Sequence, residues 1–255
     1  MRYFLEVAYK GTDFAGFQVQ QNASTIQGEV EKALQTVFKT KVELTGSSRT
    51  DAGVHALQNY FHFNVDFEIP QEIIYNLNAI LPFAIVVKSI QVVALVAHSR
   101  FHALGREYKY FITKTKNPFA TDTAWFYPYT INIELLNQAA ALLFQHTNYS
   151  AFAKRNTQAK SNQCTIAKSL WYYQNDLLVY NVAANRFLRG MVRGLVGTML
   201  LVGRNKLTLE NFTQIIEAKD CTKANFATPA HGLFLVKVEY PSGINSNLLS
   251  NRQSF

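Results

Sequence analysis

The sequence predicts an α+β protein made of two units, and three observations carry that prediction. The chain has 255 residues, which at roughly 150 residues per domain allows one large domain or two modest ones. Apolar residues make up 48% of the chain and charged residues 16%, a composition typical of folded globular proteins. Strand and helix patterns do not alternate one for one, and their order restarts at Gly105. We therefore expect two α+β units, residues 1–104 and 105–255, rather than a single barrel.

The first unit begins with a strand and a helix. Residues 3–9 are rich in the apolar and aromatic side chains that favour a strand. The sequence Ser24-Thr25-Ile26-Gln27 has the form of a capping box, which predicts the start of a helix. The apolar face of that helix is formed by side chains at helical spacing, namely Ile26, Val30, Ala33, Leu34 and Val37.

The rest of the first unit is predicted as two strands, a helix and a last strand. A short strand over 41–45 and a longer one over 56–65 flank a polar turn over 46–53. Pro70 is expected at the first position of a second helix. The β-branched residues of 85–96 predict a buried strand. The predicted order is thus strand, helix, strand, strand, helix, strand.

The second unit repeats a similar mixture of patterns after Gly105. Its predicted elements are strands over 108–113, 164–173, 177–183 and 232–240 and helices over 133–144, 185–202 and 209–218. Gln174-Asn175-Asp176 is the expected turn of a hairpin. The segment from about 241 onward is rich in Ser and Asn and is expected to be a loose tail.

Charge and cysteine content indicate the partner and the compartment. Lys and Arg number 25 against 17 acids, a net charge of +8, and such a surplus favours a polyanion such as nucleic acid. Cys164 and Cys221 form neither a disulfide framework nor a closely spaced metal pair, which fits a reducing cytoplasm. The N-terminus has no export signal, and polar residues interrupt the most apolar stretch, 79–97. We therefore expect no membrane segment.

The common signatures of nucleotide-binding loops, zinc proteases and serine hydrolases are absent from the sequence. His98 and His102 are four residues apart, but no acid lies between them, so we interpret them as polar residues near a sheet end rather than as metal ligands. Gly190, Gly194 and Gly197 predict close packing of one helix against a sheet. We expect no metal and no cofactor.

The most informative stretch is the charged turn Arg49-Thr50-Asp51-Ala52-Gly53-Val54-His55-Ala56. By composition alone, Asp51 could simply cap backbone amides in an Asx-type turn. The order of the residues, however, resembles the signature of the tRNA pseudouridine synthase A family, whose members share one catalytic aspartate.

Four further blocks extend the resemblance along the chain. They are residues 9–18, 99–110, 184–193 and 229–233, and residues 25–28 also follow the family's order. The sequence departs from the family's pattern at Lys10, Phe17, Ser48 and Asn148. These departures concern RNA affinity and loop shape rather than the reaction.

The resemblance implies a role for each of four residues. Asp51 is expected to be catalytic, and Tyr108 to stack on a target base flipped out of the RNA. Arg193 is expected to pair with Asp51, with about 4 Å between the charged atoms, and Arg49 to fill the vacated stack or hold a phosphate. His55 is expected to be structural.

The resemblance also implies a fold, a substrate and an assembly. The fold would be two ferredoxin-like (RRM-like) units with a basic central cleft, and the substrate uridine in the anticodon stem-loop of tRNA. Pseudouridine forms when the same uracil is rejoined to the sugar through C5, so no cofactor or metal is needed. A cytoplasmic homodimer is expected. The alternatives are a catalytically silent protein that binds or folds tRNA and a synthase for another RNA.

Overall fold

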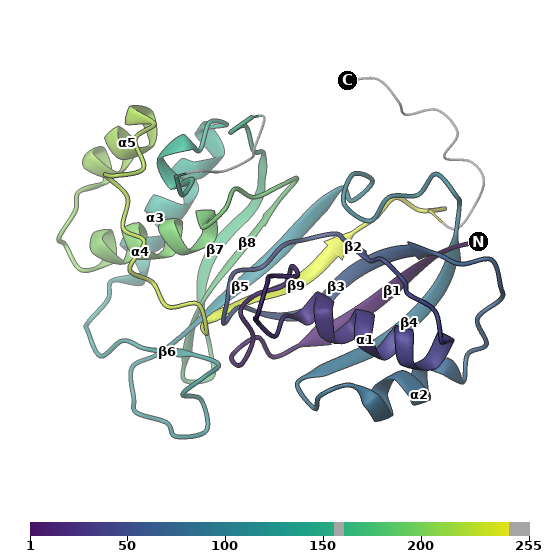
Figure 1. Ribbon diagram of the computed structural model, residues 1–255. Coiled ribbons are helices and arrows are strands. Elements are labelled where there is room, and N and C mark those ends of the chain that lie inside the picture. Colours follow the sequence, from purple (N-terminus) through teal and green to yellow (C-terminus); the bar gives the residue numbers. More distant parts are fainter. Residues whose placement is uncertain (156–160, 245–255) are drawn as a thin grey trace. The chain divides into compact units, whose positions relative to one another are not determined.

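The structure is a computed structural model that describes residues 1–155 and 161–244 (Figure 1). The chain forms two compact units, Met1–Leu104 with Leu235–Phe255, and Gly105–Phe234. The division after residue 104 is the expected one, but the chain from Leu235 onward belongs to the first unit instead of the second. One reason is a backbone hydrogen bond of 2.7 Å from the Leu104 N–H to the C=O of Glu239. The expected loose tail lies mostly outside the described residues.

Up to residue 104, the first unit contains three main strands, one short strand and two helices. Its elements are β1 (Arg2–Tyr9), α1 (Ile26–Phe38), β2 (Thr45–Gly46), β3 (His55–Asn64), α2 (Ile73–Ile80) and β4 (Ile85–Val93). The strand order is β4-β1-β3, with β9 (Leu233–Glu239) next to β3, and β2 also pairs with β3. The predicted order of strands and helices is confirmed.

The sheet of the first unit has two different faces because side chains alternate along each strand. Leu5, Val7 and Phe61 are fully buried and lie on one face, which we call the apolar face. Helices α1 and α2 lie together on one side of this sheet (Figure 1), and the buried Ile26 and Leu34 of α1 supply apolar contacts for that layer. The core of the unit therefore lies between the apolar face and the two helices.

Two predictions around α1 were wrong in detail. The helix is capped by Thr25, whose side chain accepts from the Gly28 N–H, so the predicted capping box, which begins at Ser24, does not form. The predicted strand over 41–45 is reduced to the two residues of β2. The reason lies in α1, because Gln27 donates to the Leu44 C=O at 2.9 Å and Glu31 accepts from the Leu44 N–H at 3.1 Å. Side chains thus occupy the backbone groups that a strand needs for its ladder.

The predicted limits of α2 and β4 also needed correction. Pro70 precedes the helix in a tight turn, where its C=O accepts from the Ile73 N–H, and α2 begins at Ile73. The last predicted strand of the unit ends at Val93 instead of residue 96, since the Ala97 N–H closes a turn onto the Ala94 C=O.

The second unit is built on an antiparallel hairpin. Its elements are β5 (Gly105–Thr113), β6 (Trp125–Phe126), α3 (Ile133–Leu142), β7 (Ile166–Gln174), β8 (Leu177–Ala184), α4 (Met191–Gly203) and α5 (Leu209–Ala218), with short 3₁₀ helices at Leu143–Gln145 and Ser150–Phe152. The strand order is β5-β8-β7, and β6 pairs with β5. The predicted hairpin is confirmed, and so is the helix over 209–218.

The helix predicted over 185–202 starts later, at Met191. Gly190 has a φ of +76°, which no residue of a right-handed helix adopts. Before it, the Asn185 side chain accepts from the N–H groups of Thr165 and Arg186 at 2.8 Å each, so this segment is held as a loop. The helix predicted over 133–144 ends at Leu142, and its last turn is 3₁₀.

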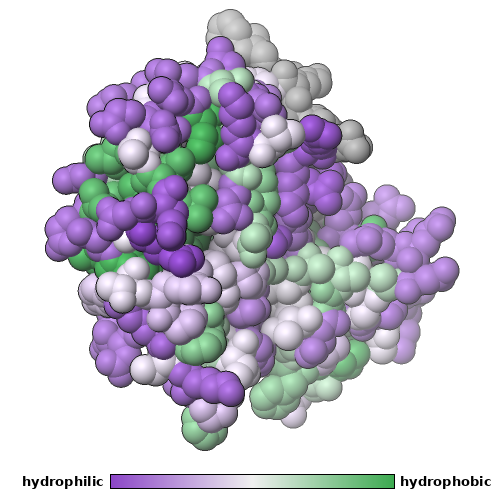
Figure 2. Space-filling view, turned by 90° about the vertical axis from the view of Figure 1, so that its left-hand side faces the viewer, coloured by the Kyte–Doolittle hydropathy of each residue, from purple (hydrophilic) through white to green (hydrophobic). Residues whose placement is uncertain are grey.

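Aromatic rings form the centre of the second unit's core. Trp171 of β7 and Tyr180 of β8 are fully buried and stack with 4.8 Å between ring centroids. Figure 2 views the molecule from the side of α3, α4 and α5, where apolar patches are exposed between hydrophilic side chains. No helix among residues 1–155 and 161–244 is both long and apolar enough to cross a membrane.

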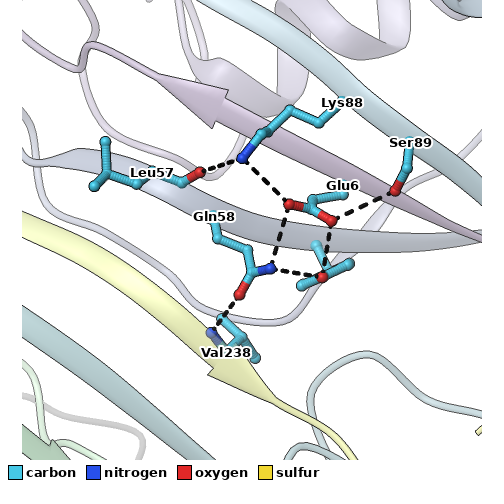
Figure 3. A network of polar contacts seen from close by, with 7 residues as sticks. Glu6, Leu57, Gln58, Lys88, Ser89 and Val238 are labelled. Atoms are coloured by element: carbon cyan, nitrogen blue, oxygen red, sulfur yellow. Dashed lines mark hydrogen bonds and ion pairs between the residues drawn. The ribbon is translucent and has the colours of Figure 1, made fainter.

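The other face of the first unit's sheet carries a network of polar side chains, drawn in Figure 3. We call this face the polar face. The Glu6 carboxylate accepts from Tyr60 Oη at 3.0 Å, from Gln58 Nε2 at 3.3 Å and from Ser89 Oγ at 3.4 Å. Lys88 Nζ lies 3.6 Å from Glu6 Oε1. Burial, together with the neighbouring Glu6 carboxylate, raises the pKa of Tyr60.

Candidate active site

Asp51 lies in the loop between β2 and β3, where the chain reverses in a tight turn. The Val54 N–H donates to the Asp51 C=O at 3.2 Å. Gly53, the third residue of this turn, has a φ of +79°, which only glycine adopts without strain. Asp51 is half-buried. The turn therefore presents a carboxylate from a fixed backbone position.

The glycine-containing motif that follows β1 holds the other side of this loop. The Phe17 N–H donates to the Thr50 C=O at 3.1 Å, and the Gly11 C=O accepts from the Gly53 N–H at 3.2 Å. A side chain at Gly11 would not fit, because its Cβ would lie 2.0 Å from the Val54 carbonyl oxygen. The two motifs, which are far apart in the sequence, thus form one structural unit around Asp51.

Asn59 of β3 forms hydrogen bonds that support the same loop. It is 0% exposed, and its Nδ2 donates to the Ser48 C=O at 2.9 Å and to Tyr9 Oη at 3.1 Å. Its Oδ1 accepts from Ser47 Oγ at 2.7 Å. Tyr9 Oη in turn lies 2.9 Å from Thr50 Oγ1. A chain of hydrogen bonds therefore runs from the middle of β3 to the residue before Asp51.

The other two residues singled out in this loop have different environments. Arg49 is exposed. His55 is buried, and its Nδ1 accepts from the Gly11 N–H at 3.1 Å. This bond gives His55 a structural role, in line with the prediction.

Tyr108 lies on β5 of the second unit, opposite Val182 of β8. Its ring contacts Phe187 edge to face, with 5.0 Å between centroids and 83° between planes. Only 8% of Tyr108 is exposed. The Phe187 contact therefore helps to fix the plane of the Tyr108 ring.

Arg193 lies in the first turn of α4, because that helix begins at Met191. Its Nε donates to the Thr228 C=O at 2.7 Å, and Thr228 Oγ1 donates back to the Arg193 C=O at 3.0 Å. Burial raises the pKa of Tyr110, and the positive charge of Arg193 opposes that rise. Tyr110 Oη donates to the Pro229 C=O at 2.8 Å, one residue beyond the Thr228 C=O that Arg193 contacts. Because Tyr108 and Tyr110 lie on the same face of β5, Arg193 lies on the side of the second unit that Tyr108 faces.

The glycines of α4 explain how this helix is held. A Cβ at Gly194 would lie 2.8 Å from the Phe226 ring, and one at Gly197 would lie 2.3 Å from the Asn225 carbonyl oxygen. The predicted close packing of this helix therefore involves the 225–228 segment rather than a sheet. That segment ends at Thr228, the partner of Arg193.

Two departures from the family's pattern lie at the Asp51 loop and preserve its contacts. Phe17 is buried and stacks on Phe61 with 4.8 Å between centroids, so an aromatic side chain remains at this position. Ser48 contributes its backbone C=O to Asn59, a group that glycine would also offer.

The other two departures lie away from the loop. Lys10 is exposed, and its N–H donates to the Ala84 C=O at 2.9 Å. Asn148 Oδ1 accepts from the Ser150 N–H at 3.0 Å and from Ser150 Oγ at 2.7 Å. A carboxylate could accept both bonds equally well, so the amide keeps this turn intact.

The structure divides the predicted residues between the two units. Asp51 and Arg49 share one loop of the first unit, whereas Tyr108 and Arg193 lie in the second. The sequence analysis missed Asn59 and the hydroxyl of Tyr9. The signal for Asn59 was present, since it is a polar residue in the strand sequence Gln58-Asn59-Tyr60-Phe61 at a position whose alternate neighbours are apolar.

No cluster of three or more potential metal ligands was found among residues 1–155 and 161–244. The two histidines considered as ligands serve as hydrogen-bond acceptors. His102 Nδ1 accepts from the His98 N–H at 3.0 Å, and His98 Nδ1 accepts from the Arg100 N–H at 3.1 Å.

Comparisons with known proteins agree with the motifs around Asp51. The family model described as tRNA pseudouridine synthase matches residues 6–102 and 139–241. A protein of Parabacteroides distasonis called tRNA pseudouridine synthase A is 42% identical over 244 residues, which cover 94% of this chain and 96% of that protein.

Other relatives carry the same name. The tRNA pseudouridine synthase A of Bacteroides thetaiotaomicron is 41% identical over 96% of this chain and 93% of its own length. That of Staphylococcus aureus is 34% identical over 93% of this chain and 91% of its own. With its motifs and nearly its full length matched, this chain belongs to the tRNA pseudouridine synthase family of isomerases, which convert uridine to pseudouridine.

Proposed function

We propose that this chain isomerises uridine in the anticodon stem-loop of tRNA, with Asp51 as the catalytic residue. The reaction breaks the N1–C1′ bond of uridine and forms a C5–C1′ bond, while C5 loses its hydrogen and N1 gains a proton. Atoms and electrons balance without an oxidant or an energy donor. A positioned carboxylate that acts as nucleophile or base is sufficient for such a step.

The rigid presentation of Asp51 is the observation that carries this proposal. The turn closed by Val54 and the bond from Phe17 to Thr50 fix the backbone on both sides of Asp51, and its side chain is only half-buried. A carboxylate is ionised at neutral pH. A charged group held on a fixed turn, within reach of a ligand, can act on a base that enters the site.

Arg193 would hold the Asp51 carboxylate in its catalytic orientation. A positive charge in the first turn of a helix is unfavourable because the helix dipole is positive there. The bond from Arg193 Nε to the Thr228 C=O holds the Arg193 side chain in spite of this, and pairing with a carboxylate would offset the cost. A bidentate guanidinium contact would also orient both carboxylate oxygens.

Tyr108 would stack on the target base, and Arg49 would fill the vacated place in the RNA stack or bind a phosphate. Because only 8% of Tyr108 is exposed, a base that stacks on its ring must displace a covering group. Phe187 contacts the ring and lies in the loop before α4, so it is a side chain that such a displacement would involve. Stacking contributes about 1–3 kcal/mol per base, which offsets part of the cost of flipping.

We further propose that each unit is ferredoxin-like and that the active site lies in a basic cleft. In the first unit, the element order with strand order β4-β1-β3 and β2 on β3 supports this assignment. In the second unit, the order β5-β8-β7 matches the order β1-β3-β2 of the first unit. By its resemblance to the family, the protein would act as a cytoplasmic homodimer.

The test is the release of tritium from a tRNA transcript labelled at C5 of uridine. The wild-type chain should release tritium, and a transcript whose anticodon stem-loop uridines are replaced by cytidine should release none. Tight binding of tRNA without tritium release would support the alternative of a silent tRNA-binding protein. Release from both transcripts would indicate a different target.

A further inference from the structure

Asn59 is a buried amide whose hydrogen-bonding capacity is completely used. A primary amide has two N–H donors and an oxygen with two acceptor sites. The donors of Asn59 bond to the Ser48 C=O and Tyr9 Oη, and its oxygen accepts from Ser47 Oγ and the Tyr60 N–H. These four bonds determine the orientation of the amide, because a flip would set an amide N–H against the Tyr60 N–H and the amide oxygen against the Ser48 C=O.

The same bonds impose a direction on the Tyr9 hydroxyl. Tyr9 Oη accepts from Asn59 Nδ2 at 3.1 Å, so its own hydrogen can be directed to Thr50 Oγ1, 2.9 Å away. Thr50 is the residue before Asp51. Its C=O is held by the Phe17 N–H, so both its backbone and its side chain are fixed.

An irregularity in the sheet brings Tyr9 to this position. The strands β1 and β3 run side by side (Figure 1), with Val7 opposite Asn59 and Tyr9 opposite Ala56. Two steps along β1 thus match three along β3. Such bulges re-aim side chains and are frequent beside active sites. Here the bulge lies near the start of β3, directly after the Asp51 loop.

An apolar side chain at residue 59 would fit the pattern of this face better than an amide. The neighbours on the same face, such as Leu5 and Phe61, are apolar and fully buried. A buried amide must recover the cost of its desolvation through hydrogen bonds. Its advantage over an apolar side chain is that it fixes the direction of the groups bonded to it.

We propose that Asn59 and Tyr9 are positioning residues that set the orientation of Asp51 through Thr50. This inference rests on the proposed function. Asn59 is 0% and Tyr9 5% exposed, and their polar atoms bond to one another and to Ser48 and Thr50, so we assign them no contact with the substrate. They act on the rate of the chemical step by keeping the backbone before Asp51 in place, where a displacement of about 1 Å costs on the order of 100-fold.

Two tyrosines of the same sheet provide a matched experiment. Tyr9→Phe removes the hydroxyl between Asn59 and Thr50, and Tyr60→Phe removes the hydroxyl between Gln58 and Glu6 on the polar face. We expect Tyr9→Phe to lower the single-turnover rate of pseudouridine formation at least about tenfold, with the Kd for tRNA within about twofold of wild type. Tyr60→Phe should leave the single-turnover rate and the Kd within about twofold of wild type, even though the loss of its hydrogen bonds should lower the Tm.

Thr50 provides a second test if Tyr9→Phe does not fold. Thr50→Val keeps the shape and loses the acceptor, whereas Thr50→Ser keeps the acceptor. We expect Thr50→Val to lower the rate about as much as Tyr9→Phe and Thr50→Ser to restore most of it. The double variant that combines Tyr9→Phe with Thr50→Val should be no slower than the slower single variant, because both changes break the same bond between Tyr9 Oη and Thr50 Oγ1.

Several outcomes would overturn the inference. They are equal rates for Tyr9→Phe and Tyr60→Phe, additive losses in the double variant, or a loss that appears only in the Kd. An inactive wild-type chain in the same assay would instead overturn the proposed function, and the positioning role with it.

Discussion

The two faces of the first unit's sheet carry two polar networks of opposite character. On the apolar face, the network of Asn59, Tyr9 and Thr50 is neutral, with Asn59 and Tyr9 buried and Thr50 half-buried, and it ends at the residue before Asp51. On the polar face, the network of Glu6 and Lys88 is charged, and Lys88 is about half exposed, with 48% of its side chain accessible. Water screens the second network but not the first. The neutral network can therefore fix a loop rigidly. The charged network mainly satisfies the hydrogen-bonding groups of its own side chains.

The largest difference between the two networks should appear when a charge is introduced into the neutral one. Asn59→Asp would place a carboxylate oxygen against the Ser48 C=O, which now accepts from Nδ2 at 2.9 Å. An unpaired buried charge costs about 3 kcal/mol or more. We expect a loss of this size in the free energy of unfolding, measured by urea denaturation.

Asn64→Asp is the matched control for this change. Asn64 is exposed on the same strand, and its Oδ1 already accepts from Arg2 Nε at 2.9 Å. A carboxylate keeps that bond, so the free energy of unfolding should stay within about 0.5 kcal/mol of wild type. Equal destabilisation of the two variants would show that the Asn59 network has no special rigidity.

An intermediate effect is expected from pH. The polar face holds His62, whereas the neutral network of Asn59, Tyr9 and Thr50 contains no histidine. Burial, followed by the charges of His98 and Arg2, lowers the pKa of His62 to about 4. In the unfolded chain this pKa is about 6.5. Between these pH values the unfolded state binds more protons than the folded state. The contribution of His62 to stability is therefore fully present above pH 6.5 and is lost as the pH falls toward 4.

Thermal unfolding at several pH values tests this expectation. The Tm of the wild type should fall between pH 6.5 and 4. In His62→Gln, which retains an acceptor for the Ser99 N–H and does not titrate, the fall should be smaller. An unchanged pH dependence in this variant would assign the acid sensitivity to other groups.

The smallest effect is expected from the ion pair of the polar face. Lys88→Met keeps most of the side-chain stem and removes the charge 3.6 Å from Glu6. Exposed pairs contribute about 0–1 kcal/mol, so we expect a loss in that range that becomes smaller at high salt. A loss above about 2 kcal/mol would mean that the charged network is as rigid as the neutral one.

The sequence was sufficient to predict elements whose local signals agree with their packing. The helix Leu209–Ala218 has a Thr208 cap and a clear apolar face, and Asn175, with a φ of +53°, marks the hairpin turn. The strand predicted around Leu44 did not form because side chains of α1 bind the backbone of Leu44. Contacts of this kind depend on tertiary structure and leave no local pattern.

The candidate site shows the same division. Asp51 was singled out by its motif, and the turn around it follows from Gly53. Asn59 was not found, because a polar residue in a strand is usually assigned to solvent. Its role depends on a register shift between β1 and β3, and the sequence alone does not specify that shift.

The most direct test of the catalytic role of Asp51 is the single-turnover rate of pseudouridine formation in Asp51→Asn. The isostere keeps the shape and removes the charge, so tRNA binding and Tm should be retained while the rate falls by several orders of magnitude. Asp66→Asn, an exposed aspartate of the same unit, is the control and should match wild type. A rate for Asp51→Asn within about tenfold of wild type, roughly 1.4 kcal/mol in the barrier, would contradict the account.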